Sequence, residues 1–258
     1  MESFFFESIS SLLTSSKSIF DDIYLLNFYF ANAYMIGSKE RYILVDTGFK
    51  NSKFYIKKII RKHFDNRIPK AIILTHGHFD NIGSAKYFEK EWKIPVYAHI
   101  KEIPYISGKN INEKKDEHLK SNLVAKLSKY KYNILLDDLN VKALPEDETI
   151  PYLDDWRWIH CPGHTEGHIA LFRDKDRTLI CGDALMTKTK ITFLQSDLLS
   201  TENSIDLSKY NPFDYEVAKK SIYKLQQLHP FLLLPSHGKP LSKDKLISHL
   251  HFLMKQIF

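Results

Sequence analysis

Short apolar runs, separated by polar and turn-forming residues, dominate the hydrophobic pattern of this chain. Runs of roughly four to eight apolar residues bounded by Gly, Pro, Asn or Asp are typical of buried strands. The pattern therefore predicts strands in both halves of the chain. The runs are residues 23–28, 33–36, 42–45, 71–74, 96–99, 157–160, 168–172, 178–181 and 231–234.

Longer segments between these runs carry apolar residues at helical spacing, with charged residues on the opposite face. The predicted helices are residues 52–63, 82–92, 113–130, 212–228 and the segment from 242 onward. We expect Asp214 to cap the fourth of these, because a carboxylate can accept the free N–H groups of a first turn. The chain has no repeat, low-complexity tract or Gly/Ser linker, so we expect a single domain over residues 1–258.

The composition is that of an ordinary soluble globular protein, with 43% hydrophobic and 26% charged residues in 258. The two cysteines, Cys161 and Cys181, argue against a disulfide framework and fit a reducing compartment. The first residues lack the basic start of a signal peptide, and no stretch approaches the roughly 20 apolar residues of a membrane span. We therefore expect a cytoplasmic protein with no membrane partner.

The formal net charge of +6 raises the question of an acidic partner. Lysines are spread along the whole chain, whereas a nucleic-acid interface concentrates basic residues on one face. The charge pattern favours a solvated lysine-rich surface and predicts no nucleic-acid partner. It remains compatible with an anionic small-molecule substrate.

The first chemistry-bearing pattern follows the predicted strand 71–74. His76, His78 and Asp80 alternate there, so a short extended loop can direct all three side chains to one side. Neutral imidazole and carboxylate are ligands for zinc, and they also serve iron or manganese. By itself this pattern also fits a loop with surface histidines.

Three later predicted strands are also followed by candidate ligands, in each case a His or Asp beside a glycine. The segments are Cys161 to His168, Cys181 to Asp183 and Pro235 to Gly238. Glycine lets the backbone pass close to a bound ion. Core packing does not explain polar donors at four separate strand ends, so together they predict a metal site.

In this order the motifs resemble those of the metallo-β-lactamase superfamily. The matching segments are Thr75 to Asn81, Pro162 to His168, Gly182-Asp183 and His237-Gly238, with Val45 to Gly48 upstream. The resemblance implies an α/β fold, a four-layer αββα sandwich of two mixed β-sheets with the site along one edge. It also implies one or two metal ions: His76, His78 and His164 for the first, Asp80 and His237 for the second, and Asp183 bridging both.

Two further residues are expected to stand behind these ligands. The resemblance makes Asp46 a structural support of the ligand loop and His168 a packing residue next to the metal ligands.

Asn81 departs from the family pattern, because the family has a histidine at this point of the motif. An amide oxygen is a weaker zinc donor than imidazole, so we expect a strong first site and a weakened second one, with Asn81 as a weak ligand or oxyanion contact.

The chemistry expected of such a site is hydrolysis by a metal-bound hydroxide, with Asp80 orienting the nucleophile or moving its proton. The resemblance offers lactones, thioesters, β-lactams, phosphodiesters and persulfides as substrates, and among small molecules we expect an ester, lactone or thioester. Insertions near residues 100–140 and 184–212 are expected to form the pocket walls. Their aromatic and basic residues would suit an apolar acyl group and an anionic end; they are Tyr105, Tyr130, Tyr132, Phe193, Lys188 and Lys190.

Two other functions stay open at this point. Some relatives use a single iron to oxidise glutathione persulfide, and a weakened second site makes such an oxidoreductase an alternative. A non-catalytic ligand-binding relative is the other, although the retention of every remaining ligand argues against it. One iron would favour oxidation, whereas zinc would favour hydrolysis.

Overall fold

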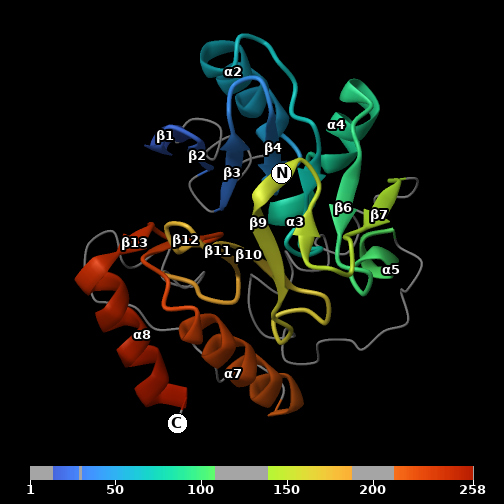
Figure 1. Ribbon diagram of the computed structural model, residues 1–258. Helices are drawn as coiled ribbons and strands as arrows, with labels where there is room; N and C mark the ends of the chain where they lie inside the picture. Colours follow the sequence, from blue (N-terminus) through green and yellow to red (C-terminus); the bar gives the residue numbers. More distant parts are fainter. Residues whose placement is uncertain (1–13, 29–30, 108–138, 188–211, 258) are drawn as a thin grey trace, which may run out of the picture. The chain divides into compact units, whose positions relative to one another are not determined.

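The structure is a computed structural model that describes residues 14–28, 31–107, 139–187 and 212–257. Its contacts divide the chain into two compact units. Unit 1 comprises Met1–Leu144 with Pro151–Leu153, and unit 2 comprises Pro145–Ile150 with Asp154–Phe258. Each unit carries one mixed β-sheet and its own helices (Figure 1).

The sheet of unit 1 has seven strands, and their spatial order follows the chain. The strands are β1 (Ser15–Phe20), β2 (Ile23–Asn27), β3 (Asn32–Gly37), β4 (Tyr42–Val45), β5 (Ile72–Ile73), β6 (Val96–Ala98) and β7 (Val141–Ala143). Strands β1 to β4 form an antiparallel meander, and β4 to β7 run parallel. The parallel half requires three crossovers, and each of them contains a helix. The ends of β4 and β5 therefore lie side by side at one edge.

The crossovers of unit 1 carry α2 (Ser52–His63), α3 (Phe79–Ile82) and α4 (Ala85–Trp92), and α5 (Ile103–Ile106) follows β6. Apolar side chains of α2 and α4 pack on the sheet in one hydrophobic cluster. Phe88 of α4 is fully buried there and stacks on Trp92 with 3.8 Å between ring centroids. This packing fixes the segments that lead into and out of β5.

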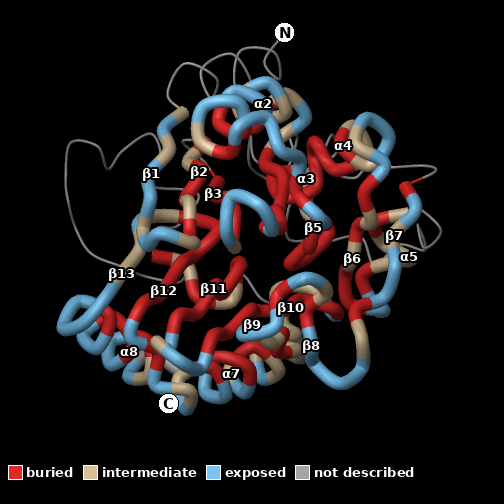
Figure 2. The backbone as a smooth tube through the Cα atoms, turned by 45° about the horizontal axis from the view of Figure 1, so that its top comes forward, coloured by how far each residue is buried: buried red, intermediate tan, exposed pale blue. Residues whose placement is uncertain are grey.

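The sheet of unit 2 has six strands in the order β13-β12-β11-β10-β9-β8. They are β8 (Thr149–Ile150), β9 (Leu153–His160), β10 (Ile169–Arg173), β11 (Thr178–Gly182), β12 (Leu232–Pro235) and β13 (Leu241–Ser242). Strands β11 and β12 run parallel, whereas β9 to β11 and the pair β12 and β13 run antiparallel. Helices α7 (Pro212–Gln227) and α8 (Lys243–Ile257) share a hydrophobic cluster with the strands. Figure 2 shows β10 to β12 buried along their length, whereas α8 alternates between buried and exposed positions.

Most predicted elements are confirmed within a residue or two. The helix over 52–63 is confirmed at its predicted bounds. The helix predicted over 82–92 instead forms two helices, α3 and α4, which separate at Gly83-Ser84. The predicted cap at Asp214 is wrong, because α7 begins at Pro212 and places Asp214 in its first turn. Proline suits a first turn because its missing N–H has no intrahelical acceptor there.

Several other expectations meet the structure only in part. The helix predicted over 113–130 lies outside the described residues. The short elements β1, β7, β8, β13 and α5 were not predicted. No helix in the described part of the chain is long and apolar enough to cross a membrane. The single domain over residues 1–258 stays a prediction.

Two phenylalanines of unit 1 provide a test of this packing. Phe88→Ala should lower the free energy of unfolding by about 3–5 kcal/mol, because it removes a fully buried ring from the core. Phe54→Ala should change it by less than about 0.5 kcal/mol, because Phe54 on α2 is 68% exposed. Urea denaturation of both variants measures the difference. Equal effects would show that the α4 face is not core.

Candidate metal centre

The ligand loop of unit 1 begins at a buried threonine held by an aspartate. Asp46, at the end of β4, accepts the Thr75 N–H at Oδ1 (2.9 Å) and the Thr75 hydroxyl at Oδ2 (2.8 Å). The Thr75 oxygen lies 3.0 Å from Nδ1 of His76. Because the hydroxyl proton is given to Asp46, that oxygen accepts the Nδ1 proton of His76. His76 therefore keeps the lone pair on Nε2.

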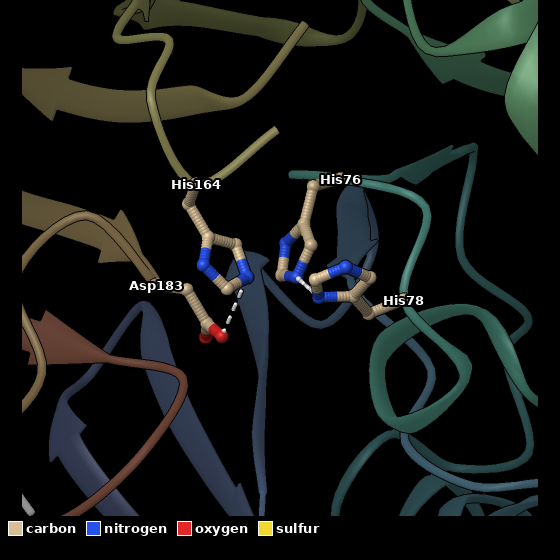
Figure 3. Close-up of side chains that lie close together, drawn as sticks. All are labelled: His76, His78, His164 and Asp183. Atoms are coloured by element: carbon tan, nitrogen blue, oxygen red, sulfur yellow. Dashed lines mark hydrogen bonds and ion pairs between the residues drawn. The ribbon is translucent and has the colours of Figure 1, made fainter. Parts of the chain in front are cut away.

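The Nε2 atom of His76 faces a second imidazole. It lies 3.1 Å from Nδ1 of His78, and the two rings are nearly perpendicular (Figure 3). His76 is fully buried, and His78 is partly exposed. Two nitrogen lone pairs at this distance repel each other unless a proton or a cation lies close to both. The pair has the geometry of a partial cation site.

Asp80 and Asn81 belong to the short helix α3, and both are buried. The Asn81 backbone carbonyl accepts the Thr47 N–H (2.6 Å) and the Thr47 hydroxyl (2.9 Å), which fixes α3 beside the end of β4. The Asn81 amide nitrogen lies 3.3 Å from Nε2 of His76 and 3.4 Å from Oδ1 of Asp80. Its Oδ1 atom has no hydrogen-bond partner among the described residues.

The second group of donors lies entirely in unit 2, at the ends of three strands. The Asp183 side chain is fully buried after β11. One of its carboxylate oxygens lies 3.0 Å from Nε2 of His164 (Figure 3), and the other lies 3.2 Å from Nε2 of His237. Asp183 thus stands between two imidazoles, where the resemblance placed a bridging ligand.

Glycine at one of these strand ends is required by close packing. Gly163, directly before His164, has φ +134°, and a Cβ there would lie 2.5 Å from the Cα atom of Ala218 in α7. No side chain fits between the ligand loop and this helix, so a larger residue would push His164 away. The Pro-Gly-His order therefore has a steric reason.

His168 supports the Asp183 loop with one ring nitrogen, and its other ring nitrogen faces Cys161. Its Nε2 accepts the Asp183 backbone N–H at 3.0 Å, and its Nδ1 lies 3.1 Å from Sγ of Cys161. Burial lowers the pKa of His168 to about 3, so the ring is neutral at physiological pH. Both nitrogens are thereby engaged, and His168 orients Asp183 through its backbone. Burial also raises the pKa of the Cys161 thiol, which leaves it protonated.

Two residues beside the candidate ligands were missed by the sequence analysis. Buried Glu102 accepts the Gly77 N–H at 2.8 Å, between His76 and His78. Thr187 bonds the His237 carbonyl through its own N–H at 3.2 Å. Neither residue belongs to a motif. Residues 100–106 carry two adjacent charged residues, Lys101 and Glu102, among apolar ones, and this was the available signal for Glu102.

The predicted pocket walls are described only in part. Tyr105 lies in α5, where its ring lines the space beside Gly77. The other aromatic and basic residues proposed for the pocket, Tyr130, Tyr132, Phe193, Lys188 and Lys190, lie outside the described residues.

The four side chains drawn in Figure 3 are imidazoles and a carboxylate, which are donors able to hold a metal ion. His76 and His78 belong to unit 1, and His164 and Asp183 belong to unit 2. Each pair presents converging donor atoms within its own unit. Asp80 lies beside the first pair in sequence, and His237 contacts the second.

Comparison with known proteins gives these donors a context. The family model of the metallo-beta-lactamase superfamily matches residues 26–237. The probable metallo-hydrolase YflN of Bacillus subtilis is 39% identical over 232 residues, which cover 88% of each chain. A hydroxyacylglutathione hydrolase of Xylella fastidiosa is 28% identical over 154 residues, 59% of this chain and 44% of that protein. The crystal structure of a beta-lactamase domain protein from Burkholderia ambifaria matches with a TM-score of 0.66 at 18% identity, covering 93% of this chain and 76% of that one.

These likenesses agree with the motifs and with the two mixed sheets. The predicted fold class is confirmed by the structural likeness, and the names of the relatives support a metal-dependent hydrolase as the activity class. Since the family model covers most of the sequence, the chain belongs to the metallo-β-lactamase superfamily.

Proposed function

We propose that the donors of both units bind one metal centre, and that the protein uses it to hydrolyse a small-molecule ester, lactone or thioester. The observation that carries this proposal is the buried Asp183 carboxylate, whose two oxygens each face the Nε2 atom of an imidazole. An ionised carboxylate without exposure to water is costly unless cations or hydrogen bonds compensate it. A divalent cation shared with the two histidines would supply that compensation.

The donor set of unit 1 also fits a cation. Thr75 fixes the proton of His76 on Nδ1, so Nε2 is left as a donor beside the ring of His78. Imidazole nitrogen and carboxylate oxygen suit zinc, and iron or manganese accept the same donors. We therefore propose His76, His78 and His164 for a first metal, with Asp183 shared and Asp80 and His237 for a second. Zinc is the metal that we propose.

When bound, a divalent cation polarises a substrate carbonyl and lowers the pKa of a coordinated water from 15.7 to about 7. The chain itself must then orient the attacking water and take its proton. Asp80 is the residue that we propose for this role, because its buried carboxylate lies in α3 next to the ligand loop. His168 contributes only by holding the Asp183 backbone.

Two arguments support the proposed substrate class: the chemistry of the donor set and the similarity to a named hydrolase. Hydrolysis at a carbonyl needs a polarising cation and a general base, and this donor set offers both without a nucleophilic Ser or Cys. The Xylella fastidiosa relative is named for a hydroxyacylglutathione, which is a thioester. A thioester panel should therefore be tested beside esters and lactones.

Iron-dependent oxidation of a persulfide is the alternative, because the same donors accept iron. Elemental analysis of the purified protein, combined with the substrate panel, separates the two functions. Zinc with carbonyl hydrolysis would support the proposal. A single iron, with oxidation of glutathione persulfide and no hydrolysis, would replace it. A protein with no bound metal and no turnover would favour the third function, a non-catalytic ligand-binding relative.

The histidine donors give the most direct test. His76→Ala, His78→Ala and His164→Ala should each remove most bound metal and nearly all hydrolysis, because the first metal loses one of its three imidazole ligands. Elemental analysis and activity measure the result. His251→Ala is the control, since His251 is exposed on α8. Full metal content in the His164→Ala protein would show that the two donor sets do not share a metal.

The two carboxylates should behave differently. Asp183→Ala should weaken all metal binding, whereas Asp80→Asn should keep the first metal and lower turnover by roughly 10²–10⁴-fold, as expected for a lost acid–base group. Metal content and kcat of the same preparations provide the comparison, with exposed Asp174→Asn as the control. Equal metal loss in the Asp80 and Asp183 variants would leave Asp80 without a separable catalytic role.

Asn81 should make the second metal weak. Its amide lies against Nε2 of His76 and Oδ1 of Asp80, where the family motif has an imidazole. We expect one tight and one weak zinc equivalent in calorimetric titration, and Asn81→His should tighten the second. Asn66→His, which adds an exposed imidazole elsewhere, should leave both unchanged. Two tight equivalents in the unaltered protein would contradict the role given to Asn81.

A further inference from the structure

A buried carboxylate outside the proposed ligand set lies against the ligand loop. Glu102 is 2% exposed, and its Oε2 atom accepts the backbone N–H of Gly77 at 2.8 Å. Gly77 is the residue between His76 and His78, so this bond acts on the peptide that joins the two imidazoles. All of these residues belong to unit 1.

The position of Glu102 is itself fixed by its backbone. Its N–H donates to the His99 carbonyl at 2.9 Å, and its carbonyl accepts the Ile106 N–H at 2.9 Å. Glu102 therefore stands at the junction between the end of β6 and the start of α5. With its backbone held at this place, Glu102 has only its side-chain torsions left to order when the carboxylate bonds Gly77.

The same short segment also closes the space beside Gly77. A Cβ atom at Gly77 would lie 2.6 Å from Cδ1 of Tyr105 and 3.1 Å from Cγ1 of Ile106. Segment 102–106 thus contacts Gly77 twice, through a hydrogen bond and through close packing. The loop cannot turn at this point without breaking one contact or compressing the other.

We propose that Glu102 is a positioning residue of the metal centre. Its carboxylate sets the orientation of the Gly77 peptide and so keeps Nε2 of His76 and Nδ1 of His78 converged at 3.1 Å. Asp46 and Thr75 fix the His76 ring itself, whereas Glu102 fixes the angle between the two histidines. This inference rests on the proposed metal-binding function.

The choice of acceptor supports this role. A hydrogen bond from an N–H to a carboxylate is shorter and stronger than one to a neutral acceptor. Keeping a carboxylate buried is costly, however, and a merely structural acceptor could have been neutral. A strong bond at the midpoint of a ligand pair is what precise positioning requires, because outer partners of metal ligands typically alter affinity by 10–100-fold.

Three substitutions at Glu102 test the proposal. Glu102→Ala removes the acceptor, Glu102→Asp withdraws the charged acceptor by one methylene, and Glu102→Gln retains a neutral acceptor at the same reach. The affinity for the first equivalent of cobalt, measured by chelator competition, should fall by about 10–100-fold for Ala. It should fall less for Asp, which keeps the charge, and Gln, which keeps only the reach, should recover only part of the loss.

The visible spectrum of bound cobalt separates positioning from stability. Glu102→Ala and Glu102→Asp should shift the ligand-field bands, because the angle between the two imidazoles changes. Ile60→Ala, at a buried residue of α2, is the stability control and should leave the bands unchanged. If the Glu102→Ala variant does not fold, the affinity and spectrum of the Glu102→Asp variant test the positioning role, since this variant keeps the carboxylate.

Two outcomes distinguish this inference from the proposed function. If cobalt binds equally to the unaltered protein and to His76→Ala, the metal centre itself is refuted. If His76→Ala loses the metal while Glu102→Ala and Glu102→Asp keep the affinity and the spectrum of the unaltered protein, only the positioning role is refuted. A lower Tm of the metal-free Glu102 variants with an unshifted cobalt spectrum would also overturn it.

Discussion

A single buried carboxylate connects the sheet of unit 1 to its chemistry. Asp46 directly follows β4 and adopts the left-handed region, at φ +59°, and its N–H donates to the Ile73 carbonyl of the neighbouring strand. From there both carboxylate oxygens hold Thr75, and the Thr75 hydroxyl fixes the proton of His76. The strained backbone is retained because these bonds over-determine it. Orientation of the first imidazole therefore depends on how β4 and β5 pair.

In unit 2, a hydrogen bond between a backbone N–H and an imidazole orients the donor carboxylate. A neutral His168 receives the Asp183 N–H and thereby directs the loop that carries the carboxylate. Burial is what keeps His168 neutral, so the apolar core around Cys161 takes part in orienting the donor. In both units the residue behind the donor is polar, buried and fully engaged. Ligand atoms held in this way need little rearrangement to accept an ion.

The sequence predicted the features that depend on local pattern. The helix over 52–63 has the predicted bounds because its apolar spacing is set within the helix itself. The candidate strand-end donors could be proposed from the sequence because they stand in short, ordered motifs that contain glycine. Glu102 could not be found in this way, since its role depends on contact with Gly77, 25 residues earlier in the chain. The edge strand β1 was missed because its exposed polar residues break the apolar pattern.

Four buried carboxylates lie at or beside the candidate ligands, and burying them costs folding free energy. Asp46, Asp80, Glu102 and Asp183 are all almost completely buried. Each ionised carboxylate carries a desolvation cost that hydrogen bonds offset only in part. A sequence selected for stability alone would replace such groups with apolar residues, and sites that break this rule are commonly functional. A cation bound only by the folded protein would add its binding free energy to folding, so the carboxylates that weaken the metal-free protein would stabilise the loaded one.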